Sequence, residues 1–195
     1  MSNALRGRRR TLAAMLCMAG YGSCALAQAP IYKKPVPSGL VVERWAPTGD
    51  AEKFFDPHGG DLRQELWLAS REDKKGLLVF FGGDDNTYAD VMKQSVLRND
   101  EVQSYFKSRL RTITLDRSSA RTLVNLRGET VSESRFAADA GVSRSPAFVF
   151  IDLLGKQRYR HQQPIFDAFG MINFARCMAD GIYARADVER SLRDR

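Results

Sequence analysis

The chain has 195 residues, of which 44% are hydrophobic and 27% are charged, and its formal net charge is +7. These proportions are typical of a soluble globular protein with one domain, and they exclude a disordered, collagenous or multi-span membrane chain. Its three cysteines are too few for a disulfide-dense scaffold.

The first 27 residues predict a secretory signal peptide. Four arginines and no acidic residue precede a short apolar run at 12–19, and the segment ends in an A-x-A sequence at 25–27. A basic start, a short apolar run and a small-residue cleavage site are the three parts of such a signal. The apolar run is too short to anchor the chain across a bilayer. We expect cleavage after Ala27, because a cut after Ala29 would leave Pro30 beside the scissile bond.

Cleavage there changes both the charge and the cysteine count. It removes four of the seven net positive charges, which leaves +3, and it leaves Cys177 as the single cysteine. The remaining charges of both signs are interspersed, so we expect no nucleic-acid partner. The expected location is the periplasm, with no membrane span after cleavage. Residues 22–24 also resemble a lipoprotein site, so a lipid anchor at Cys24 stays open as a less favoured alternative.

Three segments follow the signal. Residues 28–60 hold five prolines, which fix the backbone and remove hydrogen-bond donors, so we expect an extended lead-in that is not a core element. Residues 61–186 carry regular helical and strand patterns and form the predicted domain. Residues 187–195 form a charged tail in which the two signs alternate.

Within the domain, apolar spacing predicts helices that alternate with strands. In chain order we expect helix 61–74, strand 77–81, a helix through Tyr88, Val91 and Met92, a helix capped at 99 or 100 that includes 102–106, strand 110–115, helix 132–140, strand 147–151, strand 156–161 and a final helix that includes 171–182. Residues 116–131 are expected to be irregular. Asp61 and Ser132 are expected N-caps, because their side-chain oxygens can accept hydrogen bonds from the first helical turn.

Two unbroken apolar runs decide the fold class. Residues 77–81 and 147–151 predict strands that are buried on both faces, as in a sheet with helices on either side. The strand at 156–161 is more polar and suits a sheet edge. The predicted class is therefore α/β, with a central mixed β-sheet flanked by helices.

Two blocks of sequence add a resemblance to this pattern. The first holds the strand 78–81 and residues 96–106, and the second runs from Gly128 to Asp152. Both blocks resemble the exported thioredoxin-like proteins of the sulfur-oxidation (Sox) type, and the resemblance covers about residues 61–185. It implies a thioredoxin-like fold, in which Pro146 takes the family's cis-proline position.

The resemblance also implies a C-x-x-C pair after the first strand, and this chain departs from it there. The four matching positions are Asn86, Thr87, Tyr88 and Ala89, so both cysteines are absent. Thiol–disulfide exchange needs an attacking thiolate and a second thiol that resolves the mixed disulfide. Cys177 lies far along the chain and is no simple substitute. We therefore predict that the protein is not a dithiol oxidoreductase.

The fold would still keep a peptide-binding groove between this loop and the proline. Asp85 and Asn86 form one side, at the start of a helix, and Ser145 and Pro146 form the other side. Free backbone groups in such a place can pair with an extended peptide. The alternative is purely structural, with Asn86 as a helix cap and Pro146 in a turn.

Cys177 has two interpretations, a small buried hydrophobic side chain or an exposed thiol that forms an intermolecular disulfide. No metal site or cofactor is predicted. Asp84 and Asp85 lack the further spaced oxygens of a calcium site, and the two histidines of the chain lack zinc-ligand companions.

The sequence therefore favours a non-catalytic module that binds a protein or peptide of the cell envelope. Two alternatives stay open. One is a thiol–disulfide redox protein that acts through Cys177 or through a partner thiol, and the other is a structural subunit of an envelope assembly.

Overall fold

The computed structural model describes residues 53–83 and 87–193. Its elements in chain order are α1 (Leu62–Arg71), β1 (Gly76–Gly82), α2 (Thr87–Gln94), a short 3-10 helix (Val96–Arg98), α3 (Asp100–Arg109), β2 (Arg111–Asp116), β3 (Thr122–Val124), β4 (Thr130–Ser132), α4 (Glu133–Asp139), β5 (Ala147–Asp152), β6 (Gln157–His161), α5 (Ala168–Ala179) and α6 (Arg185–Arg193). Among these residues, no helix is long and apolar enough to cross a membrane.

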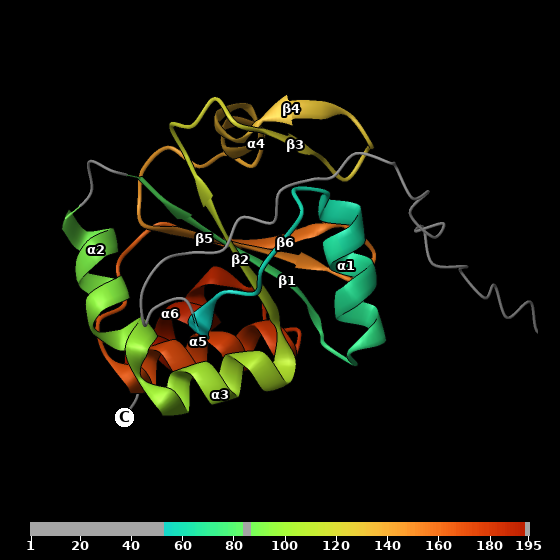
Figure 1. Cartoon of the computed structure of the whole chain (residues 1–195). Coiled ribbons are helices and arrows are strands. Elements are labelled where there is room, and N and C mark those ends of the chain that lie inside the picture. Colours follow the sequence, from blue (N-terminus) through green and yellow to red (C-terminus); the bar gives the residue numbers. More distant parts are fainter. Residues whose placement is uncertain (1–52, 84–86, 194–195) are drawn as a thin grey trace, which may run out of the picture.

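Four strands form the central sheet in the order β2-β1-β5-β6 (Figure 1). β1 runs parallel to β2 and antiparallel to β5, and β6 is antiparallel to β5. Phe80 stands opposite Thr114 on one side and opposite Phe148 on the other. The sheet is therefore mixed, as the sequence predicts, and β6 lies at its edge.

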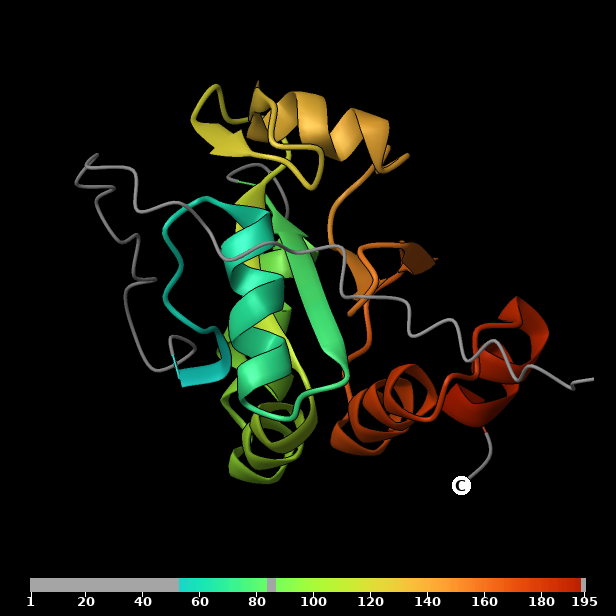
Figure 2. The same ribbon diagram turned by 90° about the vertical axis from the view of Figure 1, so that its right-hand side faces the viewer.

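Side chains of the two central strands alternate between two cores. Leu78, Phe80, Phe148 and Phe150 belong to the core that α2, α3, α5 and α6 cover. Leu77, Val79, Val149 and Ile151 belong to the opposite core, which α1 and α4 cover. Figures 1 and 2 show α3 and α5 together on one side of the sheet and α1 on the other. Burial on both faces explains why β1 and β5 are unbroken apolar runs.

Three helices begin at the polar residues that the sequence suggests. The Asp61 carboxylate accepts a hydrogen bond from Arg63 N at 2.9 Å, and Asn99 Oδ1 accepts one from Val102 N at 3.1 Å. The Ser132 hydroxyl accepts one from Arg135 N at 3.0 Å. These bonds satisfy backbone donors that no helical carbonyl can reach.

The predicted start of the domain at residue 61 needs correction. Phe54 and Phe55 are buried in the core beneath α3 and β1, so the end of the lead-in is a core element. Asp56 N donates to Thr112 O at 2.6 Å, and His58 Nε2 donates to Thr114 O at 3.1 Å. These residues cover the outer edge of β2, which would otherwise present unpaired backbone groups.

The end of the chain also differs from expectation. The last predicted helix ends at Ala179, because Gly181 adopts a φ of +78° that turns the chain. Ile182, expected on the apolar face, lies beyond this helix and is 41% exposed. Residues 187–193 of the segment predicted as a charged tail belong to α6, where Val188 is fully buried. Most of the stretch expected to be irregular forms the β3–β4 hairpin, in which Thr122–Val124 pairs with Thr130–Ser132.

Candidate functional site

Residues 86–89, where the resemblance implies a C-x-x-C pair, follow β1 in the chain. Asp85 and Asn86 lie outside the described residues. Thr87 is the first residue of α2. Tyr88 is 58% exposed, whereas Ala89 is fully buried. The helix α2 therefore begins within these four positions, and the Tyr88 side chain faces outward.

The proline loop lies directly beside this segment. The Ser145 hydroxyl donates a hydrogen bond to Gly82 O at 3.1 Å, although the two residues are 63 positions apart. A Cβ added to Gly83 would lie 3.7 Å from Ser145 Oγ, which is ordinary contact. The peptide bond between Ser145 and Pro146 is cis. Pro146 itself is buried and Ser145 is half-buried, so Ser145 is the described proline-loop residue that reaches the surface.

Cys177 lies on α5 and is only 2% exposed. It belongs to the core that also holds Phe148 and Phe174, and it forms no disulfide with any described residue. The interpretation as a small buried hydrophobic side chain is therefore the correct one of the two. A thiol in this position is not open to a disulfide substrate at the surface.

An exposed aromatic pair stands beside the loop, and sequence reasoning missed it. The ring centroids of Tyr88 and Phe166 are 6.1 Å apart, and the two residues are 58% and 46% exposed. Val91, one turn along α2, is 42% exposed, and Phe169 at the start of α5 is 43% exposed. The sequence predicts a helix through Tyr88, Val91 and Met92, and of these three Met92 is fully buried, as is Ala89. α2 thus has one apolar face in the core and a second at the surface.

The carboxyl ends of β1 and β2 hold a buried polar cluster. Glu133 is fully buried, its Oε2 accepts from Asp116 N at 2.7 Å, and its Oε1 lies 3.2 Å from Arg121 Nε. Burial raises the pKa of the Glu133 carboxyl. The hydrogen bond from Asp116 N and the Arg121 guanidinium lower this pKa, and the Asp116 carboxylate raises it. These bonds fasten the end of β2 to the start of α4, which is a structural role.

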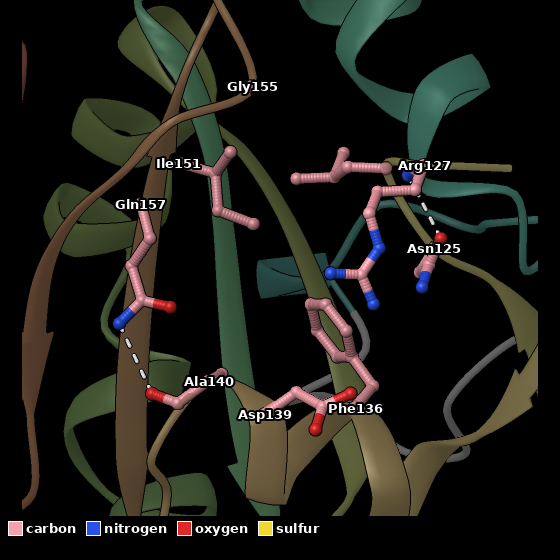
Figure 3. A pocket seen from close by; sticks show the side chains of 9 residues that line it. Asn125, Arg127, Phe136, Asp139, Ala140, Ile151, Gly155 and Gln157 are labelled. Atoms are coloured by element: carbon pink, nitrogen blue, oxygen red, sulfur yellow. Dashed lines mark hydrogen bonds between the residues drawn. The ribbon is translucent and has the colours of Figure 1, made fainter. Parts of the chain in front are cut away.

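A separate pocket of about 220 Å³ lies between α4 and the turn that joins β5 to β6 (Figure 3). Phe136, Ala140 and Ile151 give it apolar walls, and Figure 3 shows the Arg127 guanidinium pointing into it. Gln157 Nε2 donates to Ala140 O at 3.1 Å. Ile151 lies five residues beyond Pro146 along β5, or roughly 17 Å. This pocket is therefore distinct from the proline loop.

No three side chains of the metal-ligating types gather into a possible metal site within residues 53–83 and 87–193. The described residues beside the loop offer backbone groups, the Ser145 hydroxyl and the exposed rings of Tyr88 and Phe166. Such a surface can bind a chain segment.

A comparison with protein families identifies the fold. The model of the thioredoxin-like domain matches residues 62–163, which is just over half of the chain. The chain belongs to the thioredoxin-like domain family. The matched part of this thioredoxin-like domain runs from α1 to the end of β6 and includes the loop and the proline described above.

The chain is also similar to solved structures, and the first of those described next agrees on the fold. A thioredoxin-fold protein from Helicobacter pylori is 21% identical, with a TM-score of 0.51 over 62% of this chain and 81% of that chain. A DsbH oxidoreductase is 24% identical, with a TM-score of 0.41 over 53% of this chain and 68% of that chain. A disulphide isomerase from Xylella fastidiosa Temecula1 is 21% identical, with a TM-score of 0.39 over 63% and 82%. No curated protein matches the chain.

Proposed function

We propose that this thioredoxin-like domain is a non-catalytic module that binds a protein or peptide in the cell envelope. The observation that carries the proposal is the exposed pair of Tyr88 and Phe166 at the start of α2. Aromatic rings that touch each other at the surface are typical of protein interfaces, because each buries a large apolar area on binding. The compartment rests on the predicted signal peptide of residues 1–27, and the finer likeness to Sox-type proteins is part of the same proposal.

The distribution of thiols supports a role without redox chemistry. Positions 86–89 hold no cysteine. Cys177 is enclosed in the core, so it does not offer the thiolate that disulfide exchange needs. Of the two alternatives, a redox protein acting through Cys177 is therefore the less favoured. A structural subunit would use the same exposed surface, and the identity of the partner decides between the two roles.

The proline loop lies close to the end of β1, and this supports an extended peptide as the ligand. Ser145 contacts Gly82 at the end of β1, and Tyr88 in the first turn of α2 contacts Phe166. An extended peptide placed here would find backbone groups for hydrogen bonds and rings for its apolar side chains.

Capture of partners from an envelope fraction tests the proposal. We expect the wild-type protein to retain a specific partner, and we expect Tyr88→Ala with Phe166→Ala to lose it. The matched control is Leu154→Ala with Ile182→Ala, since these residues are 46% and 41% exposed and lie outside the site. The proposal fails if both double variants retain the partner equally, or if the wild-type protein reduces insulin disulfides well above background.

A further inference from the structure

A second region of the molecule has the features of a binding site. A cavity of about 90 Å³ lies beside the edge strand β6, and its walls include Arg144, Arg160, Arg185, Glu189 and His161. The walls come from the segment before the proline loop, from β6 and from α6. Three separate parts of the chain therefore line one cavity.

The charges in this cavity do not balance. Arg185 Nε lies 2.7 Å from Glu189 Oε1, so these two residues pair with each other. Arg160 Nη1 donates to Ala140 O at 3.0 Å, which uses part of its guanidinium. Neither Arg144 nor Arg160 forms an ion pair with any carboxylate among the described residues. The Arg160 guanidinium thus lies against the end of α4, and Arg144 is left without a counter-charge among the described residues.

A buried polar atom in the same place lacks a partner. His161 is 7% exposed, and its Nε2 forms no hydrogen bond with any described residue. His161 also lines a neighbouring cavity of about 270 Å³ that reaches Phe166 and Leu192. Buried polar groups in proteins nearly always have a partner, and one that lacks it indicates a place for water or a ligand.

We propose that the cavity at Arg144, Arg160 and Arg185 binds an oxyanion, either a free anion such as phosphate or a carboxylate carried by a larger ligand. The planar guanidinium group offers paired donors that match the oxygens of both groups. A volume of about 90 Å³ holds one such group and little more. The proposal is independent of the peptide surface at Tyr88, because it uses other side chains.

The two histidines of the chain give the test an internal control. His161 lies on the edge strand β6, whereas His58 bonds to β2 at the opposite edge of the sheet. Their imidazole resonances are followed by NMR during titration with sodium phosphate, with sodium acetate, and with sodium chloride at equal ionic strength. We expect a saturable shift of the His161 resonances with an oxyanion, with a Kd on the order of 1 mM. His58 should respond no more than it does to chloride.

Variants of the arginines complete the test. Arg144→Gln should weaken binding by about tenfold, because it removes one charge-assisted contact. Arg144 is exposed and has no ion pair among the described residues, so this variant should fold normally. The matched control is Arg135→Gln, an exposed arginine on α4 that pairs with Asp139. Stronger binding of acetate than phosphate would assign a carboxylate ligand, and the reverse order a phosphate.

Three results would overturn the proposal. One is a shift that grows linearly without saturation, and another is an equal response of His58 and His161. The third is an unchanged Kd in Arg144→Gln, since general salt effects on protein surfaces do not depend on one side chain.

Discussion

Replacement of His161 by phenylalanine should remove a large part of the pH dependence of stability. His161 is buried between the rings of Tyr159 and Phe174, at centroid distances of 6.5 Å and 5.6 Å. Burial lowers the pKa of His161 from 6.5 to about 4, which is the largest effect. Glu189 raises this pKa and Arg185 lowers it, both from α6, and a backbone hydrogen bond with Gln163 raises it.

The sign of the effect follows from the difference between the two states. A histidine with a lowered pKa in the folded protein binds fewer protons there than in the unfolded chain. The contribution of His161 to the free energy of unfolding is therefore fully present above pH 6.5. It is lost as the pH falls from 6.5 toward 4. Between pH 7 and pH 5 the loss amounts to about 2 kcal/mol of the free energy of unfolding.

The assay is urea unfolding of both proteins at several pH values between 5 and 7. Cationic buffers with chloride avoid any oxyanion in the cavity at Arg144. We expect the free energy of unfolding of His161→Phe, relative to wild type, to increase by about 2 kcal/mol from pH 7 to pH 5. His58, Glu65 and Glu133 also have shifted pKa values, but they occur in both proteins and cancel in the difference.

The matched control is Tyr159→Phe, which changes a neighbouring ring that does not titrate between pH 5 and 7. Its difference from wild type should be constant over this range. If the difference for His161→Phe is equally constant, burial of the neutral imidazole does not govern the titration, and the reasoning is refuted.

Two further variants test the core and the motif. Arg111→Met leaves the buried Glu65 without the guanidinium that lies 2.6 Å from it. We expect the free energy of unfolding, measured in urea, to fall by about 3–5 kcal/mol. Arg135→Met, which removes an exposed ion pair, should lower it by less than about 1 kcal/mol. Equal losses would contradict the role of burial. Asn86→Cys with Ala89→Cys should reduce insulin disulfides, and Ala89→Cys alone should not, because a second thiol must resolve the mixed disulfide. A folded but inactive double variant would show that the motif lies elsewhere.

Patterns that act over a few residues could be interpreted correctly from the sequence. Asp61 and Ser132 cap their helices because a side-chain oxygen reaches the first turn whatever lies around it. The runs that become β1 and β5 could be recognised since both of their faces meet helices. The β3–β4 hairpin escaped notice because each strand has three residues, which is too short for a period of two to appear.

Interactions between distant segments could not be predicted in this way. Phe54 and Phe55 follow a proline-rich stretch, and their burial depends on rings of α3 and β1 that come later in the chain. The same holds for Val188, whose helix packs on α5 although most of its neighbours in sequence are charged. In both places the local composition predicts exposed residues, whereas contacts with distant parts of the chain bury Phe54, Phe55 and Val188.

The surface at Tyr88 shows why a binding site of this kind leaves so little trace in a sequence. α2 carries apolar residues on two faces, with Ala89 and Met92 in the core and Tyr88 and Val91 at the surface. Periodicity alone detects both faces and cannot tell which one the domain itself covers. The structure distinguishes the two faces, because the Tyr88 ring lies beside Phe166, which is itself exposed. Tyr88 and Val91 are 58% and 42% exposed, and the proposed binding role predicts that a partner buries this apolar area.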